Sequence, residues 1–288
     1  MHPPRTVTAH DGVGLAVHEL GGEGPLLLLG HATGYCSGVW APLVRSLADN
    51  FRCVAIDGRA HGMSGRPDPA DFSRSLLATD VLAVLSELRV TGPVFGAGHS
   101  AGATGLMLAE AERPQTFAAL WAFEPVFFPA RPPDEDEDEE ALFNPLATAA
   151  RKRRAEFVDR DEALRHYQQR PPFSRFHPDA LAAFVACAIV PDGSTGGMRL
   201  ACDPEDEARF YETDDLEEGW HKVERVTCPV TFATGDQPGA FGPRHAELLA
   251  SRVLYGQAEV LPGLTHFGPL EAPDLVAESI RDSLGTGA

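Results

Sequence analysis

The residues best suited to carry out a chemical reaction are the five from Gly98 to Gly102, which read Gly-His-Ser-Ala-Gly. They follow an apolar run at 94–97 and precede a stretch of small residues at 101–111 that is suited to a helix. A strand, a sharp turn with a serine and then a helix are typical of a nucleophilic serine. Glycines on either side permit the close backbone approach that such a strained turn requires. The pattern predicts acyl-transfer chemistry with Ser100 as the attacking group.

A serine hydroxyl is a weak nucleophile until a neighbouring base takes its proton. The chain has eleven histidines, so their positions must decide between them. His266 lies in a Pro-Gly turn at 262–267, after the last expected strand and before the last expected helix. In a sheet with this order of elements that loop lies over the strand ends beside Ser100, so we predict His266 as the base. His31, His61 and His99 are better explained as packing and orienting residues of the turns that contain them.

Two acids compete for the third role, which is to orient the imidazole and stabilise its charged form. Asp236 follows an expected strand, and Glu124 ends the one at 118–123. In the common pattern the acid lies four residues before the proline that opens the next helix. Counting back from Pro243 gives Gly239, so the usual position holds no acid. Glu124 lies within an apolar stretch, where a carboxylate needs a buried partner. We favour Glu124, and Asp236 is the alternative.

Acyl transfer also needs N–H groups aimed at the developing oxyanion. The amide of Ala101, next to the nucleophile, is one candidate. We expect the other in the loop at 30–34, with the Thr33 amide as the best candidate. The glycines of that loop do not fit the G-x-G-x-x-G pattern of dinucleotide binding, and no ribose-binding acid is suitably placed.

These residues need a sheet to position them, and the rest of the chain predicts one. Asp11-Gly12 is a favoured hairpin turn between two strands, and four leucines at 26–29 indicate a strand buried on both faces. Further strands are expected at 53–56, 94–97, 118–123, 229–233 and 259–261, and helices at 39–47, 75–88, 101–111, 243–249 and 273–284. Strands that alternate with helices in this way imply a mostly parallel sheet with helices on both faces.

Between about residues 129 and 225 this alternation stops. The segment passes through seven consecutive acids at 134–140, which we interpret as a solvated loop, and then takes on helical composition at 159–167 and 179–190. Five aromatic residues give it apolar anchors and argue against a disordered linker: Phe157, Tyr167, Phe173, Phe176 and Phe184. We predict a helical cap inserted after the sixth strand. Its basic quartet at 151–154 is expected to pair with nearby acids.

The composition limits the possible partners. With 288 residues the chain can form one α/β domain plus an insertion. A net charge of −18 argues against nucleic acid and anionic membrane surfaces as partners. It also mildly disfavours anionic substrates, although the basic quartet can reverse this locally.

The five cysteines are odd in number and have no C-x-x-C spacing, which predicts reduced thiols in a reducing compartment and no zinc ligand set. Cys36 follows the third strand, near the expected site, and is interpreted as a small buried filler. The first residues lack the apolar core of a signal peptide, and no apolar run has the length needed to span a bilayer. We therefore expect a cytoplasmic protein.

Four motifs in this order resemble the α/β-hydrolase superfamily over nearly the whole chain: residues 30–34, residues 57–64, the serine turn and His266. The resemblance implies a mostly parallel eight-stranded sheet with a core at 1–129 and 226–288, a helical cap (lid) at 130–225 and a Ser–His–acid mechanism. The 31–34 and 123–125 segments are similar to an esterase/lipase-type subgroup. Some haloalkane dehalogenases of this superfamily also carry the acid after the sixth strand. Dehalogenases and epoxide hydrolases have aspartate where this chain has Ser100.

The leading hypothesis is a serine hydrolase that cleaves a carboxylic ester of a small or medium apolar substrate through an acyl-enzyme. It needs no metal and no organic cofactor. Carbon–carbon bond cleavage, thioester hydrolysis and iminopeptidase activity use the same residues and stay open. A non-catalytic small-molecule binder of the same fold is the alternative from another class, although a binder has no need of a strained nucleophile turn. The oligomeric state is not indicated by the sequence.

Overall fold

The computed structural model describes residues 3–68, 71–129, 140–213, 216–239 and 241–285. Its main sheet has eight strands: β1 (Arg5–Thr8), β2 (Gly14–Gly21), β3 (Leu26–Gly30), β4 (Arg52–Ile56), β5 (Val94–His99), β6 (Ala119–Phe123), β10 (Val230–Gly235) and β11 (Gly256–Leu261). Across the sheet they lie in the order β1-β2-β4-β3-β5-β6-β10-β11. β2 pairs antiparallel with β1 and with β4, and all other neighbours pair in parallel. The predicted fold class is confirmed.

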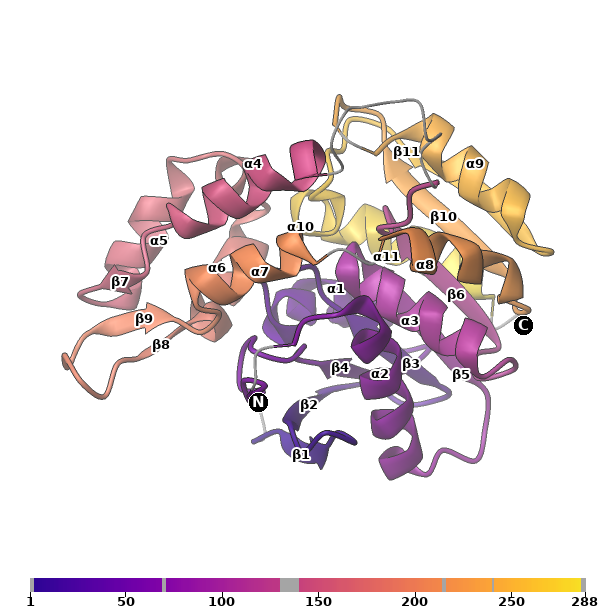
Figure 1. Ribbon diagram of the computed structural model, residues 1–288, viewed down its shortest axis with the longest axis horizontal. Helices are drawn as coiled ribbons and strands as arrows, with labels where there is room; N and C mark the ends of the chain where they lie inside the picture. Colours follow the sequence, from indigo (N-terminus) through magenta and orange to yellow (C-terminus); the bar gives the residue numbers. More distant parts are fainter. Residues whose placement is uncertain (1–2, 69–70, 130–139, 214–215, 240, 286–288) are drawn as a thin grey trace.

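Helices cover both faces of this sheet (Figure 1). They are α1 (Ala41–Leu47), α2 (Arg74–Leu88), α3 (Ala101–Glu112), α9 (Pro243–Arg252), α10 (Gly268–Glu271) and α11 (Pro273–Leu284). Side chains of β3 alternate between the two faces, as in any strand. Leu27 and Leu29 pack with residues of α1 and α11, whereas Leu26 and Leu28 pack with residues of α2, α3 and α9. This is the strand buried on both faces that the four leucines predict.

Element boundaries differ from the expected ones by a few residues. A 3-10 turn, η1 (Ser37–Trp40), precedes α1, and Pro42 lies in the first turn of that helix, where a missing N–H costs nothing. β11 begins at Gly256, three residues before the expected 259. Those extra residues pair in register with β10, whose Val230 lies opposite Gly256.

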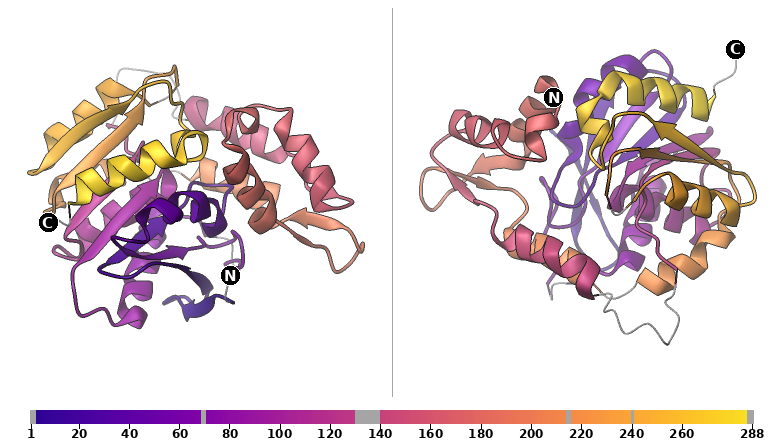
Figure 2. Two further views of the ribbon diagram at one scale, coloured as in Figure 1. Left: turned by 180° about the vertical axis from the view of Figure 1, so that it is seen from behind. Right: turned by 90° about the horizontal axis from the view of Figure 1, so that it is seen from above.

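Between β6 and β10 the chain forms a further set of elements: α4 (Glu140–Arg151), β7 (Glu156–Phe157), α5 (Arg160–Gln168), η2 (Phe173–Arg175), α6 (Pro178–Ala188), β8 (Ile189–Pro191), β9 (Met198–Leu200), α7 (Pro204–Glu212), α8 (Leu216–Lys222) and η3 (Val223–Arg225). The elements from α4 to α7 project to one side of the main sheet (Figures 1 and 2). α8 and η3 instead pack against α3. The boundaries of a cap at 130–225 stay a prediction. Of the predicted acidic loop at 134–140, residues 134–139 lie outside the described residues.

The sequence suggested that the inserted elements are all helical, but three of those that the structure describes are strands. β7, β9 and β8 form a small antiparallel sheet in that order. The helix expected at 179–190 therefore ends at Ala188, because Ile189 pairs with Leu200 in this sheet. Strands this short were missed because two or three residues are too few to show an alternating pattern.

The prediction of five reduced thiols is wrong. Cys36, just before η1, forms a disulfide with Cys187 on α6, while Cys53, Cys202 and Cys228 are free and buried. Cys36 is therefore not a filler but ties the loop after β3 to an inserted helix. The partners are 151 residues apart, so their spacing gave no signal. Cysteine usage thus no longer supports a reducing compartment. No helix among the described residues is long and apolar enough to cross a membrane.

Candidate active site

Ser100 lies between β5 and α3 with φ 53° and ψ −119°, a conformation that is strained for a residue with a side chain. The two flanking glycines are required for steric reasons. A Cβ on Gly98 would lie 2.5 Å from the Cα of Ala103, and a Cβ on Gly102 would overlap the backbone of Gly30. The Ser100 amide donates a hydrogen bond of 2.9 Å to the Phe123 carbonyl, which fixes the turn against the end of β6.

Glu124 and His266 lie in contact. His266 Nδ1 donates a hydrogen bond of 2.6 Å to Glu124 Oε2. The other carboxylate oxygen, Oε1, accepts hydrogen bonds from the Thr234 hydroxyl at 2.7 Å and the Gly235 amide at 3.0 Å. Burial alone would raise the pKa of Glu124, but the hydrogen bond and charge of His266 and the bonds from β10 outweigh it and lower the pKa. The carboxylate therefore stays ionised beside the imidazole.

Asp236, the alternative acid, is exposed and does not contact the His266 ring. Its Oδ1 accepts hydrogen bonds from the Gly263 amide at 2.8 Å and from the Gln237 side chain at 3.0 Å. Gly263 has φ +81° and forms the turn that presents His266. Asp236 thus holds the loop, and Glu124 holds the ring.

Further residues fix His266, and the sequence did not reveal two of them. His99 Nε2 donates to the His266 carbonyl at 2.7 Å, as expected of an orienting residue. The Phe241 ring stacks on the imidazole, with centroids 4.9 Å apart and planes at 18°. Glu271 accepts hydrogen bonds from the amide and the hydroxyl of Thr265, at 2.9 and 2.8 Å. Phe241 and Glu271 carry no local motif, so no sequence signal identified them.

The loop at 31–34 is held by two buried histidines. His61 Nε2 accepts a hydrogen bond of 2.8 Å from the Gly34 amide, and His31 Nε2 accepts one of 2.9 Å from the Gly58 amide. Burial, with the neighbouring His31 charge, lowers the pKa of His61 to about 3. Burial also lowers the pKa of His31. Neutral rings can accept these bonds, which agrees with the predicted orienting role of both residues.

The candidate residues meet at one cavity of about 260 Å³. Ser100, Ala101, Thr33 and His266 all line it. Within the described part of the chain, neither the Ala101 amide nor the Thr33 amide has a hydrogen-bond acceptor. Arg74 and Thr104 also line it, and the remaining walls are apolar or aromatic: Ala32, Tyr35, Leu77, Val126, Leu146, Phe210, Tyr211, Phe241 and Phe267. Two free N–H groups beside a serine hydroxyl form an arrangement that can bind an oxyanion.

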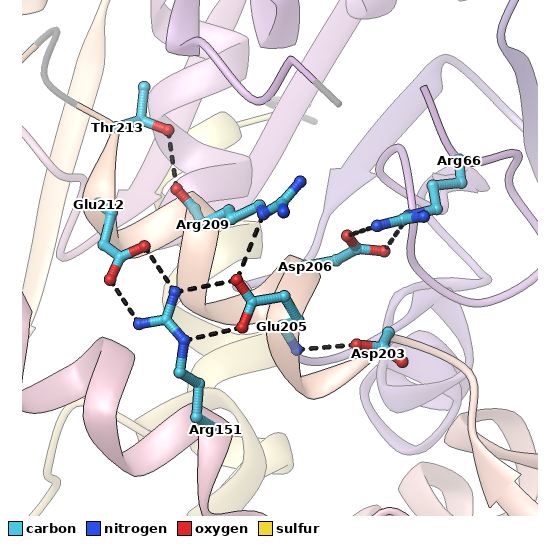
Figure 3. A network of polar contacts seen from close by, with 8 residues as sticks. All are labelled: Arg66, Arg151, Asp203, Glu205, Asp206, Arg209, Glu212 and Thr213. Atoms are coloured by element: carbon cyan, nitrogen blue, oxygen red, sulfur yellow. Dashed lines mark hydrogen bonds and ion pairs between the residues drawn. The ribbon is translucent and has the colours of Figure 1, made fainter. Parts of the chain in front are cut away.

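Three members of the basic quartet pair with acids, as predicted. Arg151 binds Glu205 at 2.8 Å and Glu212 at 2.5 Å, in a network that joins α4 to α7 (Figure 3). Arg154 binds Glu162 at 2.6 Å, and Arg153 pairs with Glu207. The Arg153 pair differs from the others because both side chains are largely buried, with 17% and 7% exposed.

A serine held in this strained turn, with a histidine and an acid supplied from the ends of β11 and β6, defines a hydrolase-like site on an α/β sheet. The chain belongs to the α/β hydrolase family, whose model matches residues 26–279.

Among curated proteins, the chain is similar to 2-(acetamidomethylene)succinate hydrolase of Mesorhizobium japonicum, with 32% identity over 103 residues. That match covers only 36% of this chain and 36% of the relative. Among solved structures, E-2-(acetamidomethylene)succinate hydrolase has a TM-score of 0.81 at 23% identity, with 98% of both chains covered. An esterase from Rhodococcus has a TM-score of 0.74 at 19% identity, with 99% of both chains covered. These structural likenesses support the fold.

Proposed function

We propose that this protein is a serine hydrolase that cleaves a carboxylic ester of a small or medium apolar substrate through an acyl-enzyme. The observation that carries the proposal is the 2.6 Å contact between Glu124 and His266, because His266 lines the same cavity as Ser100. An ionised carboxylate on Nδ1 keeps Nε2 as the proton acceptor, which is the tautomer a general base needs.

The steps of the reaction follow from these positions. Ser100 attacks the substrate carbonyl while His266 takes the hydroxyl proton, and Glu124 stabilises the imidazolium that forms. The N–H groups of Thr33 and Ala101 bind the oxyanion, a contribution typically of about 10²–10³ in kcat for each donor. His266 then protonates the leaving alcohol, and a water molecule that it deprotonates releases the acid. Apart from this water molecule, every group in the cycle belongs to the chain or the substrate.

The size and lining of the cavity support a small or medium substrate. About 260 Å³ suits an acyl chain of a few carbon atoms, and the apolar wall favours burial of such a chain. Thioester hydrolysis, carbon–carbon bond cleavage and iminopeptidase activity use the same three side chains, so a substrate panel must separate them. A non-catalytic binder is disfavoured by the strain retained at Ser100.

The test compares Ser100→Ala with the wild type on 4-nitrophenyl acetate, butyrate and hexanoate, together with a thioester and a prolyl anilide. We expect Ser100→Ala to lower ester turnover by at least about 10³-fold. Ser251→Ala, on an exposed serine at the end of α9, is the matched control and should keep wild-type turnover. Undiminished ester turnover in a folded Ser100→Ala protein would refute the serine mechanism.

A further inference from the structure

A second cavity, of about 420 Å³, adjoins the one that contains Ser100. The two cavities share five lining residues: Thr33, Tyr35, Leu146, Tyr211 and Phe267. The second one extends under the inserted elements, between the end of α4, the end of α5 and α7. A molecule with its reacting group at Ser100 can therefore extend into this second space.

The second cavity is positively charged in a strongly acidic protein. Among the described residues that line it, Lys152, Arg153, Arg154 and Arg170 are cationic and Glu207 is the one carboxylate. The chain as a whole carries a net charge of −18. A concave site lined by one sign of charge focuses the field and concentrates ligands of the opposite sign.

Arg153 has unused hydrogen-bonding capacity in this cavity. Its Nη1 pairs with Glu207, whereas its Nε and Nη2 are enclosed and make no well-formed hydrogen bond among the described residues, with the Tyr167 hydroxyl beside the guanidinium. Tyr167 lines the same cavity, and its enclosed hydroxyl lies beside the Arg153 guanidinium without a well-formed hydrogen bond in the described part of the chain. Buried donors without a well-formed hydrogen bond destabilise a protein, and more so when they are charged. A ligand that separates the two side chains and accepts these bonds removes that destabilisation.

The geometry of the Nε–Nη2 edge of Arg153 indicates which ligand fits. Nε and Nη2 form the side of a guanidinium that holds a carboxylate with two parallel bonds. Four other arginines among the described residues use that side in this way, including Arg52 with Glu19 and Arg151 with Glu205. Arg59 binds Asp80 at 2.9 and 2.6 Å, and Arg66 binds Asp206 at 2.7 Å through both nitrogens (Figure 3 shows the second pair).

The Arg153–Glu207 pair rests against the loop that carries Thr33. A Cβ on Gly34 would lie 2.6 Å from Glu207 Oε1 and 2.8 Å from Arg153 Nη1, so the pair packs directly on this backbone. Glu207 thereby fixes the guanidinium in place, and the other edge becomes available to a ligand that separates Arg153 from Tyr167. A group bound at that edge has a defined position relative to the loop beside Ser100.

We propose that Arg153 and Tyr167 form a carboxylate subsite, and that the substrate carries a carboxylate joined by a short apolar spacer to the bond attacked by Ser100. The inference rests on the proposed hydrolytic function and adds the second functional group of its substrate. The aromatic side chains of Tyr35, Phe173 and Phe267 line the cavity and enclose the spacer. A low-dielectric wall strengthens the charged hydrogen bonds at its far end.

The kinetic test compares 4-nitrophenyl monoesters of adipate and pimelate with the neutral hexanoate and heptanoate esters. We expect the wild type to prefer the carboxylated esters by at least tenfold in kcat/KM, mainly through a lower KM. Arg153→Lys retains a positive charge for Glu207 but loses the paired N–H donors of Nε and Nη2. It should reduce that preference at least tenfold. Tyr167→Phe should reduce it about threefold. Arg165→Lys, on an exposed arginine of α5 outside the cavity, should not change it.

The subsite is wrong if the wild type shows no preference, or if Arg153→Lys lowers the rates for both classes of ester equally. A wild type that hydrolyses neither class would instead refute the hydrolytic function. In that case calorimetric titration with adipate tests whether the carboxylate subsite exists. Binding to the wild type that weakens at least tenfold in Arg153→Lys supports the subsite, and absence of binding to the wild type refutes it.

Discussion

The Glu124 carboxylate and the His266 imidazole lie 2.6 Å apart although 142 residues separate them along the chain. Glu124 follows β6 and His266 follows β11, and β10 lies between these strands in the sheet. All three run in parallel, so their carboxyl ends meet at one edge. β10 contributes the Thr234 hydroxyl and the Gly235 amide, which hold the second carboxylate oxygen. The contact is therefore a product of strand order.

Exchange of Glu124 for glutamine should remove most of the activity. The amide is uncharged and cannot stabilise the imidazolium, so we expect kcat for 4-nitrophenyl butyrate to fall by about 10³–10⁴. Asp236→Asn is the matched control. Its side-chain oxygen can still accept the Gly263 amide, and kcat should stay within about threefold of wild type. The opposite result, a large loss of kcat only in Asp236→Asn, would show that Asp236 is the acid that supports His266.

Gly102→Ala should destabilise the fold. The new methyl group would overlap the Gly30 backbone, which cannot move away because it is the end of a central strand. We expect a loss of at least about 2 kcal/mol in the free energy of unfolding, measured by urea denaturation. Gly92→Ala is the control, since a Cβ there meets nothing within 4 Å, and it should change stability by less than about 0.5 kcal/mol. Equal stability of the two variants would contradict the close approach of β3 and α3.

Stability should decrease on mild acidification, in part because of His61. Its pKa is about 3 in the folded protein, well below the ordinary histidine value of 6.5. The unfolded chain therefore binds the proton first as the pH falls. The contribution of neutral His61 is complete above about pH 6.5 and is lost toward pH 3, with a slope of up to about 1.4 kcal/mol per pH unit.

Urea denaturation of the wild type and His61→Gln at pH 7.5, 6 and 5 tests this expectation. Glutamine retains an acceptor for the Gly34 amide but does not titrate. The stability advantage of the wild type should shrink as the pH falls. A difference that stays constant over this range would show that His61 does not take up a proton on unfolding.

The disulfide between Cys36 and Cys187 should add to thermodynamic stability. It closes a long stretch of chain, with partners 151 residues apart, so its removal by Cys187→Ser should cost about 2–5 kcal/mol. Thermal unfolding with and without dithiothreitol measures the loss, and the reductant should not lower the Tm of Cys187→Ser further. Thiol titration of the denatured chain should give three free thiols before reduction and five after it. Five thiols before reduction would exclude the bond.

Local patterns in the sequence were enough to predict the sheet and the turn at Ser100. Both depend on neighbours along the chain: the alternation of strands and helices, the leucines of β3, and glycines at Gly98 and Gly102. The loop that presents His266 was also predictable, because it follows the last strand. Backbone conformation responds mainly to the nearest residues, and therefore such features can be read from spacing.

Only the tertiary structure decided three features: which of Glu124 and Asp236 lies at the imidazole, the Cys36–Cys187 bond, and the position of Arg153 beside Glu207 and Tyr167. Each depends on residues that are distant in the chain and on the direction of their side chains. Glu124 and Asp236 both follow strands that end at the same edge, yet one carboxylate is buried against the ring and the other is exposed on a turn. Spacing along a sequence does not encode such contacts, because they arise from the order in which strands and helices pack.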